Sequence, residues 1–293
     1  MEKLNLFNVK KDDLSEYENE CFVQIKKDPE VYGLLLNNGF EDATIKKYIG
    51  SCHTFYDDYY KWKKIKTFDD VVNSGIRYIY TLKLKDGIIS RERGIIPPYQ
   101  EYIDYQSKYI YKDFDDSFDS VSLKNIDNKE LISKLKKPLK EESWIYLYGA
   151  IRSGRTYCSI ALINSSAKRG SSGLAFIDSA TRFKELSDLF FNDKVGFNRM
   201  LDSLKNAYLL VIDGFGNEYI NDIVRDSVVI PLLQYRASNK KMTIFTSDFS
   251  LNDLITLYAK RDKSGNNIRE KQLANILHSM IKDEIYTGYT SLY

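Results

Sequence analysis

The segment 149–156 constrains the fold of this chain more than any other stretch. It reads Gly-Ala-Ile-Arg-Ser-Gly-Arg-Thr, which has the spacing of a phosphate-binding loop, G-x-x-x-x-G-K-[ST], with arginine at the lysine position. The apolar run Trp144–Tyr148 precedes it, and a helix-like segment follows it. A loop of this kind works between a strand and a helix N-terminus, where backbone N–H groups hold phosphate. The segment therefore predicts a nucleotide-binding α/β fold.

Strand-like and helix-like segments alternate from Trp144 onward. The apolar runs that predict strands are Ile145–Tyr148, Leu174–Asp178, Tyr208–Asp213 and Met242–Thr246. Between them, apolar residues recur at helical spacing over 183–190 and 223–236. Pro231 lies inside the second of these helices, so we expect it to kink or interrupt the helix. The alternation predicts βαβ units and a parallel sheet with helices on both faces.

The first part of the chain has a different pattern. Apolar residues recur at helical spacing after Asp28-Pro29 and again from Ala43 to about Trp62. From Arg77 the chain alternates with period two, turns at an Asp-Gly pair and resumes as a strand, which predicts a β-hairpin. We therefore expect a smaller, mostly helical N-terminal domain with a hairpin over residues 1–98.

A connector is expected over residues 99–140, followed by the main domain over 141–293. Residues 99–122 are polar and rich in tyrosine, and the run Lys134–Lys140 is basic and broken by proline. Such a basic run suits either contacts with DNA phosphates or a solvated helix end, and the solvated helix end is favoured.

Composition narrows the class of protein. The 293 residues are 43% hydrophobic and 29% charged, as in a globular protein with a sizeable core. A net charge of +2 gives no whole-protein case for nucleic acid, although a local basic patch stays open. Cys21, Cys52 and Cys158 are widely separated, so we expect free thiols in a reducing cytosol, not a zinc ribbon or disulfide framework. Because no stretch approaches the length of a membrane span, a cytoplasmic protein without a membrane partner is expected.

The positions of the loop have separate expected roles. Gly149 and Gly154 keep the bends, and Thr156 keeps the hydroxyl that binds magnesium. Arg155 keeps the charge of the usual lysine but not its shape, because a guanidinium is planar and donates in a fixed fork. Arg152 either adds phosphate affinity or fills the site with a salt bridge to a local carboxylate. The residues expected to bind nucleotide are Gly149, Arg152, Ser153, Gly154, Arg155, Thr156 and Tyr157.

A second element follows the pattern of a Walker B strand. The apolar run from Tyr208 ends in Asp213, where such a strand places its aspartate beside the magnesium ion. The next position usually holds a second acid that polarises the attacking water, and here it is Gly214. Glu218 is close in sequence, but nothing in the sequence brings it to that water. The alternative is that Asp213 only ends a buried strand in a turn.

A third element, Thr243–Asp248, is an apolar strand that ends in polar residues. In a nucleotide-binding sheet, this strand carries a sensor side chain between the Walker B strand and the γ-phosphate. Asp213 and Asp248 are therefore the candidate catalytic residues. Thr156 and Asp213 are the candidate ligands of Mg²⁺.

Taken together, these motifs resemble the DnaI/DnaC family of bacterial replicative-helicase loaders, which are AAA+ proteins. Within residues 144–293, the resemblance is carried by Tyr146–Gly149, Leu210–Asp213, Val224–Asp226, Leu233–Arg236, Ile244–Phe249 and Leu251–Leu254. Upstream, Lys27–Tyr32 and the predicted hairpin are similar to the N-terminal domain of the family in a weaker form.

The resemblance implies a primosomal protein that acts in DNA replication. In the family, the N-terminal domain contacts the hexameric replicative helicase, and the AAA+ domain binds ATP and single-stranded DNA. The resemblance thus implies a loader that binds the helicase, assists its loading onto single-stranded DNA in replication initiation or restart, and self-associates. ATP or ADP with Mg²⁺ is the implied cofactor.

The sequence departs from the family at three catalytic elements. The P-loop lysine is Arg155, and the second Walker B acid is Gly214. The family has arginines near residues 269–277 that serve as finger and sensor between subunits. Here only Arg269 remains near that place, and it is the arginine-finger candidate. Together these departures predict weak or absent ATP hydrolysis, and they leave open whether the chain is an enzyme.

The family's N-terminal zinc site is represented only by the adjacent Cys52 and His53, so no zinc is expected. Two other functions stay open. One is a working ATPase loader in which Arg155 replaces the lysine, and the other is a transposition-helper ATPase of similar fold. A structural role without nucleotide also stays open.

Overall fold

The computed structural model describes residues 11–259 and 268–287. The chain divides into two compact units, residues 1–103 and 104–293, and each is described by itself. None of the described helices is long and apolar enough to cross a membrane.

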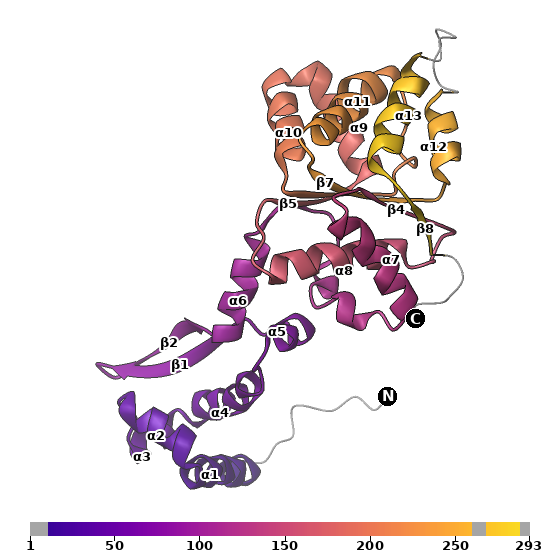
Figure 1. The fold of residues 1–293 in the computed structure, drawn as a ribbon. Coiled ribbons are helices and arrows are strands. Elements are labelled where there is room, and N and C mark those ends of the chain that lie inside the picture. Colours follow the sequence, from indigo (N-terminus) through magenta and orange to yellow (C-terminus); the bar gives the residue numbers. More distant parts are fainter. Residues whose placement is uncertain (1–10, 260–267, 288–293) are drawn as a thin grey trace. The chain divides into compact units, whose positions relative to one another are not determined.

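The first unit consists of helices and one antiparallel hairpin (Figure 1). Its elements are α1 (Lys11–Lys27), α2 (Pro29–Asn37), α3 (Asp42–Lys47), α4 (Ile49–Lys63), α5 (Phe68–Ser74), β1 (Tyr78–Lys85), β2 (Ile88–Ile95) and the start of α6 (Pro97–Gln106). The Asp28 carboxylate caps α2 by accepting from the backbone N–H groups of Glu30 at 3.0 Å and Val31 at 3.1 Å. The mostly helical N-terminal part with a β-hairpin that the sequence predicts is thus confirmed.

The core of the first unit is built from helix faces and one side of the hairpin. Its buried members include Ile25, Val31, Leu35, Phe40, Ile45, Cys52 and Leu82. Leu82 and Leu84 of β1 pack into this cluster, so one face of the hairpin is covered near its turn. Burial among apolar neighbours raises the pKa of the Cys52 thiol to about 11.

The second unit is a six-stranded parallel sheet between helices. Its elements are β3 (Tyr109–Lys112), two short 3₁₀ turns (Asp116–Phe118 and Leu123–Asn125), α7 (Lys129–Lys140), β4 (Ile145–Tyr148), α8 (Arg155–Lys168), β5 (Leu174–Asp178), α9 (Ser179–Asn192), α10 (Lys194–Asn206), β6 (Leu209–Asp213), a π-helical segment η3 (Val224–Val229), α11 (Ile230–Ser238), β7 (Met242–Ser247), α12 (Leu251–Ala259), α13 (Ile268–Met280) and β8 (Glu284–Tyr286). The strand order is β3-β5-β6-β7-β4-β8. The predicted α/β fold with a parallel sheet is confirmed.

Helices cover both faces of this sheet, as Figure 1 shows. Helices α9 to α13 lie on one side, and α7 and α8 lie on the other. The strands β4 to β7 are almost entirely buried, as expected for strands with helices on both faces. The P-loop follows β4, Gly214 follows β6, and Asp248 follows β7. Because these strands run parallel, their carboxyl ends meet at one edge of the sheet.

The predicted connector contributes to the sheet. Residues 109–112 form β3, which pairs with β5 at the sheet edge. The side chains of Tyr105 and Tyr109 both donate to Asn164 Oδ1 of α8 at 2.8 Å, which holds this segment against the helix. The sequence did not predict this strand, because four residues within a polar, tyrosine-rich stretch are too few to show a period of two.

Pro231 marks a change of helix type. The π-helical segment η3 passes into α11 at Ile230, and Pro231 lies in the first turn of α11. Helical backbone runs without a break over 222–238, so Pro231 lies inside the helix, and its missing N–H falls where the π-helical segment passes into α11. The interruption expected in this helix therefore takes the form of a π-to-α transition.

Candidate functional site

The predicted P-loop lies between β4 and α8. Its backbone has positive φ at Gly149 (+154°), Arg152 (+66°) and Gly154 (+85°). A Cβ at Gly149 would lie 3.0 Å from Ser153 Oγ, so only glycine fits this bend. Gly154 is the N-cap of α8, and no side chain caps that helix. The first N–H groups of α8 have no partner inside the helix, which is the arrangement that holds anions.

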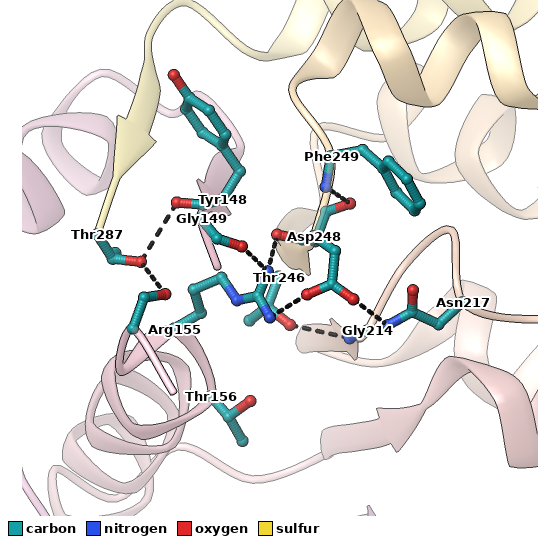
Figure 2. Close-up of polar contacts among 12 residues, drawn as sticks. Tyr148, Gly149, Arg155, Thr156, Gly214, Asn217, Thr246, Asp248, Phe249 and Thr287 are labelled. Carbon is teal, nitrogen blue, oxygen red and sulfur yellow. Dashed lines mark hydrogen bonds and ion pairs between the residues drawn. The ribbon is translucent and has the colours of Figure 1, made fainter. Parts of the chain in front are cut away.

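The guanidinium of Arg155 points back across this loop. It donates to the backbone carbonyls of Gly149 and Ser247 and forms an ion pair with the Asp248 carboxylate (Figure 2). The Arg155 side chain is 12% exposed and the Asp248 side chain 29%. We call these contacts the Arg155 clamp. It joins the P-loop to the end of β7, two segments that are 93 positions apart in sequence.

Asp248 has a second donor on the neighbouring turn. Asn217 Nδ2 donates to Asp248 Oδ2 at 2.9 Å. Partial burial raises the pKa of Asp248, but the hydrogen bonds from Arg155 and Asn217 outweigh it and hold the pKa below its ordinary value. Asp248 therefore stays ionised and forms its ion pair with the Arg155 guanidinium.

Asp213, the predicted Walker B aspartate, lies beside the predicted magnesium hydroxyl. Thr156 Oγ1 donates to its two carboxylate oxygens at 3.0 and 3.2 Å, and Thr246 Oγ1 donates to Oδ1 at 2.6 Å. Burial raises the pKa of Asp213 above its ordinary value, against the effect of these hydroxyl donors. One carboxylate and one hydroxyl on adjacent elements suit a hydrated Mg²⁺, which keeps most of its water ligands.

The position after Asp213 offers no acid. Gly214 donates from its backbone N–H to Thr246 Oγ1 at 2.9 Å and accepts from Ser179 Oγ at 2.7 Å. Glu218 is buried and turned to other partners, since it accepts from Gly216 N at 2.8 Å and from the Tyr258 hydroxyl. Burial raises the pKa of Glu218.

Most of the predicted site residues thus lie together, but three lie apart or point elsewhere. Arg152 is exposed on the loop, and Tyr157 is half-buried on α8. Arg269 on α13 forms an ion pair with Asp226 at 3.4 Å and donates to Gln272 at 2.9 Å. The salt bridge to a local carboxylate that was one expectation for Arg152 is made by Arg155.

Sequence reasoning missed three polar residues of the site. Thr246 bridges Asp213 and Gly214, and Asn217 holds Asp248. Thr287 lies after β8 and its hydroxyl is 2.8 Å from Ser153 Oγ. Thr246 and Asn217 fall near motifs that the sequence displays, whereas Thr287 carries no local signal because only the pairing of β8 with β4 brings it to the loop.

The described residues hold no group of three or more His, Cys, Asp or Glu side chains placed to bind a metal ion. His53 on α4 contacts Gln24 and Asp57.

Comparison with known proteins gives local and fold-level similarity. The replicative helicase loader DnaI of Bacillus subtilis (strain 168) is 32% identical over 113 residues, which are 38% of this chain and 34% of that protein. The match therefore spans about a third of the length of this curated relative. No protein-family model matches the chain.

Among solved structures, a crystal structure of DnaI aligns with a TM-score of 0.53 and 24% identity over 61% of this chain and 97% of that one. The DnaC helicase loader aligns with a TM-score of 0.41 and 21% identity over 55% and 89% of the two chains. The alignment with DnaI shows that this chain shares the fold of that structure. Together with the sequence match, it confirms that this chain resembles the DnaI/DnaC type of AAA+ helicase loader.

Proposed function

We propose that this protein is a primosomal loader that binds a hexameric replicative helicase and assists its loading onto single-stranded DNA. The supporting observation is the match to the helicase loader DnaI together with the AAA+ fold. We assign the contact with the helicase to the N-terminal unit. We assign the contacts with nucleotide and DNA to the AAA+ unit, and we propose that the AAA+ unit self-associates during loading. The protein acts in the cytoplasm.

We further propose that nucleotide binds weakly and that hydrolysis is weak or absent. In a standard P-loop, the lysine ammonium reaches the β- and γ-phosphate oxygens. Here the guanidinium of Arg155 is engaged by two carbonyls and the Asp248 carboxylate. A nucleotide has to replace these contacts of Arg155. Because breaking them costs free energy, the nucleotide binds more weakly than it would to a free cation.

The residues around the loop suit a nucleotide otherwise. The uncapped N-terminus of α8 would hold its phosphates, and Thr156 with Asp213 would hold its magnesium ion. When bound, the magnesium ion would neutralise phosphate charge. No acid follows Asp213 to orient water, and Glu218 is bound by Tyr258 and Gly216. The site therefore supports binding better than turnover.

The test is helicase loading by the purified full chain. A loader captures a replicative helicase and increases its assembly on a single-stranded DNA circle, with or without ATP. Capture of a transposase in place of a helicase would support the transposition-helper function and overturn this proposal.

An active ATPase loader is the second candidate, because the Thr156–Asp213–Thr246 contacts are intact. Turnover that is stimulated by single-stranded DNA and lost in Asp213→Ala would favour it. Binding of ATP with Mg²⁺ by calorimetry, without turnover in the same sample, would support the proposed weak site. If Thr156→Ala leaves every binding activity and helicase loading unchanged, the protein has a structural role that does not depend on nucleotide.

A further inference from the structure

A cleft of about 290 Å³ lies in the first unit, where the end of α4 meets the start of the hairpin. The residues that line it include Asp58, Lys61, Trp62, Arg77, Tyr78 and Tyr80. Three of these six are aromatic and two are basic. All of the lining residues belong to the first unit, and none of them is a predicted nucleotide-binding residue.

Most of the charged residues around the cleft are basic. Residues 61–66 hold four lysines and no carboxylate, and the hairpin residues 77–93 hold five basic residues and two acidic ones. Lys61 pairs with Asp58 at 3.1 Å. Among the described residues, no carboxylate pairs with Lys64, Arg77 or Arg93. All three side chains are exposed, and of these three only Arg77 lines the cleft.

Two tyrosine rings and the guanidinium of Arg93 share one face of the hairpin. Arg93 lies directly opposite Tyr80 in the strand register, so their side chains point to the same face. The Arg93 guanidinium lies 3.2 Å from the centroid of the Tyr78 ring. Tyr80 is 44% exposed, so its ring has a free surface beside these cations.

The electrostatics of Tyr78 agree with this picture. A hydrogen bond with Tyr99 and the nearby charges of Arg93 and Arg77 lower the pKa of Tyr78 below its ordinary value. Arg93 and Arg77 therefore contribute positive potential at this ring.

We propose that this cleft binds single-stranded nucleic acid. An exposed aromatic ring beside arginines that have no carboxylate partner offers a base a stacking surface and offers its phosphates cations at the same time. Tyr80 stacks with a base, and Arg77 and Arg93 contact the backbone phosphates. An acidic protein surface would need the cations but not the exposed ring, so the combination favours nucleic acid. The inference stands independently of helicase loading.

The test uses the full chain and an oligo(dT) probe with two readouts. The first is the anisotropy of the labelled oligonucleotide, and the second is the emission of Trp62, which lines the cleft. Trp62 and Trp144 are the two tryptophans, and Trp144→Phe leaves Trp62 as the only reporter. We expect saturable quenching of Trp62 by oligo(dT) and little competition from a duplex of equal length, because paired bases are already stacked.

The variants separate stacking from charge. Tyr80→Ala is expected to weaken oligo(dT) binding about tenfold, whereas Tyr80→Phe keeps the ring and the affinity. Arg77→Gln is expected to weaken binding and to lower its salt dependence. Lys85→Gln, an exposed cation at the hairpin turn, is the matched control and is expected to change binding little. Both Tyr80 and Arg77 are exposed, so these variants are expected to fold.

Three outcomes would overturn the proposal. In the first, oligo(dT) binds with no change in Trp62 emission and with equal affinity in Tyr80→Ala and Arg77→Gln. In the second, duplex DNA competes as well as single strands, so that the contact is only electrostatic. In the third, Arg77→Gln removes capture of a helicase and leaves oligo(dT) binding intact, which would make the cleft a protein-binding surface.

Discussion

The P-loop of the second unit and the cleft of the first unit use arginine in opposite ways. At the P-loop, Arg155 is bound by two carbonyls and the Asp248 carboxylate, and Asn217 holds the carboxylate from its other side. At the cleft, Arg77 and Arg93 have no carboxylate partner among the described residues. A basic residue in a phosphate-binding motif is therefore not by itself an available cation. Its availability depends on the anions that the fold brings next to it.

The largest expected effect concerns stability. Arg155→Ala removes a mostly buried cation and leaves Asp248 without its charge partner, which is expected to cost about 2 kcal/mol of unfolding free energy. Arg77→Ala removes an exposed cation and is expected to cost less than about 0.5 kcal/mol. Urea unfolding of both variants beside the unchanged protein measures the difference. Equal costs would mean that the clamp does not stabilise the fold.

The next effect concerns nucleotide affinity. Asp248→Asn keeps the shape of the side chain but removes the charge that holds Arg155, so the guanidinium becomes available to phosphate. We expect ATP to bind about tenfold more tightly, a gain of about 1.4 kcal/mol that calorimetry resolves. Asp188→Asn, which removes an exposed carboxylate on α9, is the control. If both variants bind ATP as the unchanged protein does, the clamp does not compete with nucleotide.

A smaller effect separates the two acids of the site by pH. Burial raises the pKa of Asp213, so its ionised form opposes folding, and stability falls as pH rises through that pKa. The pKa of Asp248 is lowered, so its contribution is present above the ordinary value of 3.8 and is lost as pH falls through the folded pKa. At pH 7, Asp213→Asn is expected to raise the melting temperature slightly, and Asp248→Asn to lower it. Thermal unfolding from pH 7 downward checks both signs, and a lower melting temperature for Asp213→Asn would contradict the first.

The smallest effect concerns salt. If Arg77 contacts one phosphate, Arg77→Gln is expected to reduce the slope of log affinity for oligo(dT) against log salt by about 0.7. Titrations at several salt concentrations measure that slope. Arg155→Gln serves as the contrast, because a cation that is already paired contributes little to it. A larger change for Arg155→Gln than for Arg77→Gln would reverse the comparison.

Much of this arrangement can be predicted from sequence, because it depends on local pattern. The apolar runs that end at Tyr148, Asp178 and Asp213 are strands with the predicted ends, and the Asp86-Gly87 pair forms the hairpin turn. These features depend on burial of a strand and on the turn chemistry of a few neighbouring residues.

The partners of the site residues could not be predicted in the same way. The contact between Arg155 and Asp248 exists because β4 and β7 are neighbours in the sheet. The two strands are far apart in sequence, so their pairing cannot be read from local pattern. One expectation accordingly placed a salt bridge to a local carboxylate on Arg152. Thr287 reaches Ser153 only because β8 pairs with β4. Such contacts follow from strand order, which no local period encodes.

The buried thiol of Cys158 offers a chemical probe of the start of α8, the helix that begins at Arg155. Cys158 lies in the first turn of α8, three positions after Arg155, and its N–H donates to the Gly154 carbonyl at 2.9 Å. Burial raises the pKa of this thiol to about 12, so in the closed state it is both covered and protonated. A thiol-specific reagent can therefore react only when the start of the helix opens. The rate of modification at Cys158 would therefore report how often the start of α8 opens, beside the loop that phosphate would occupy.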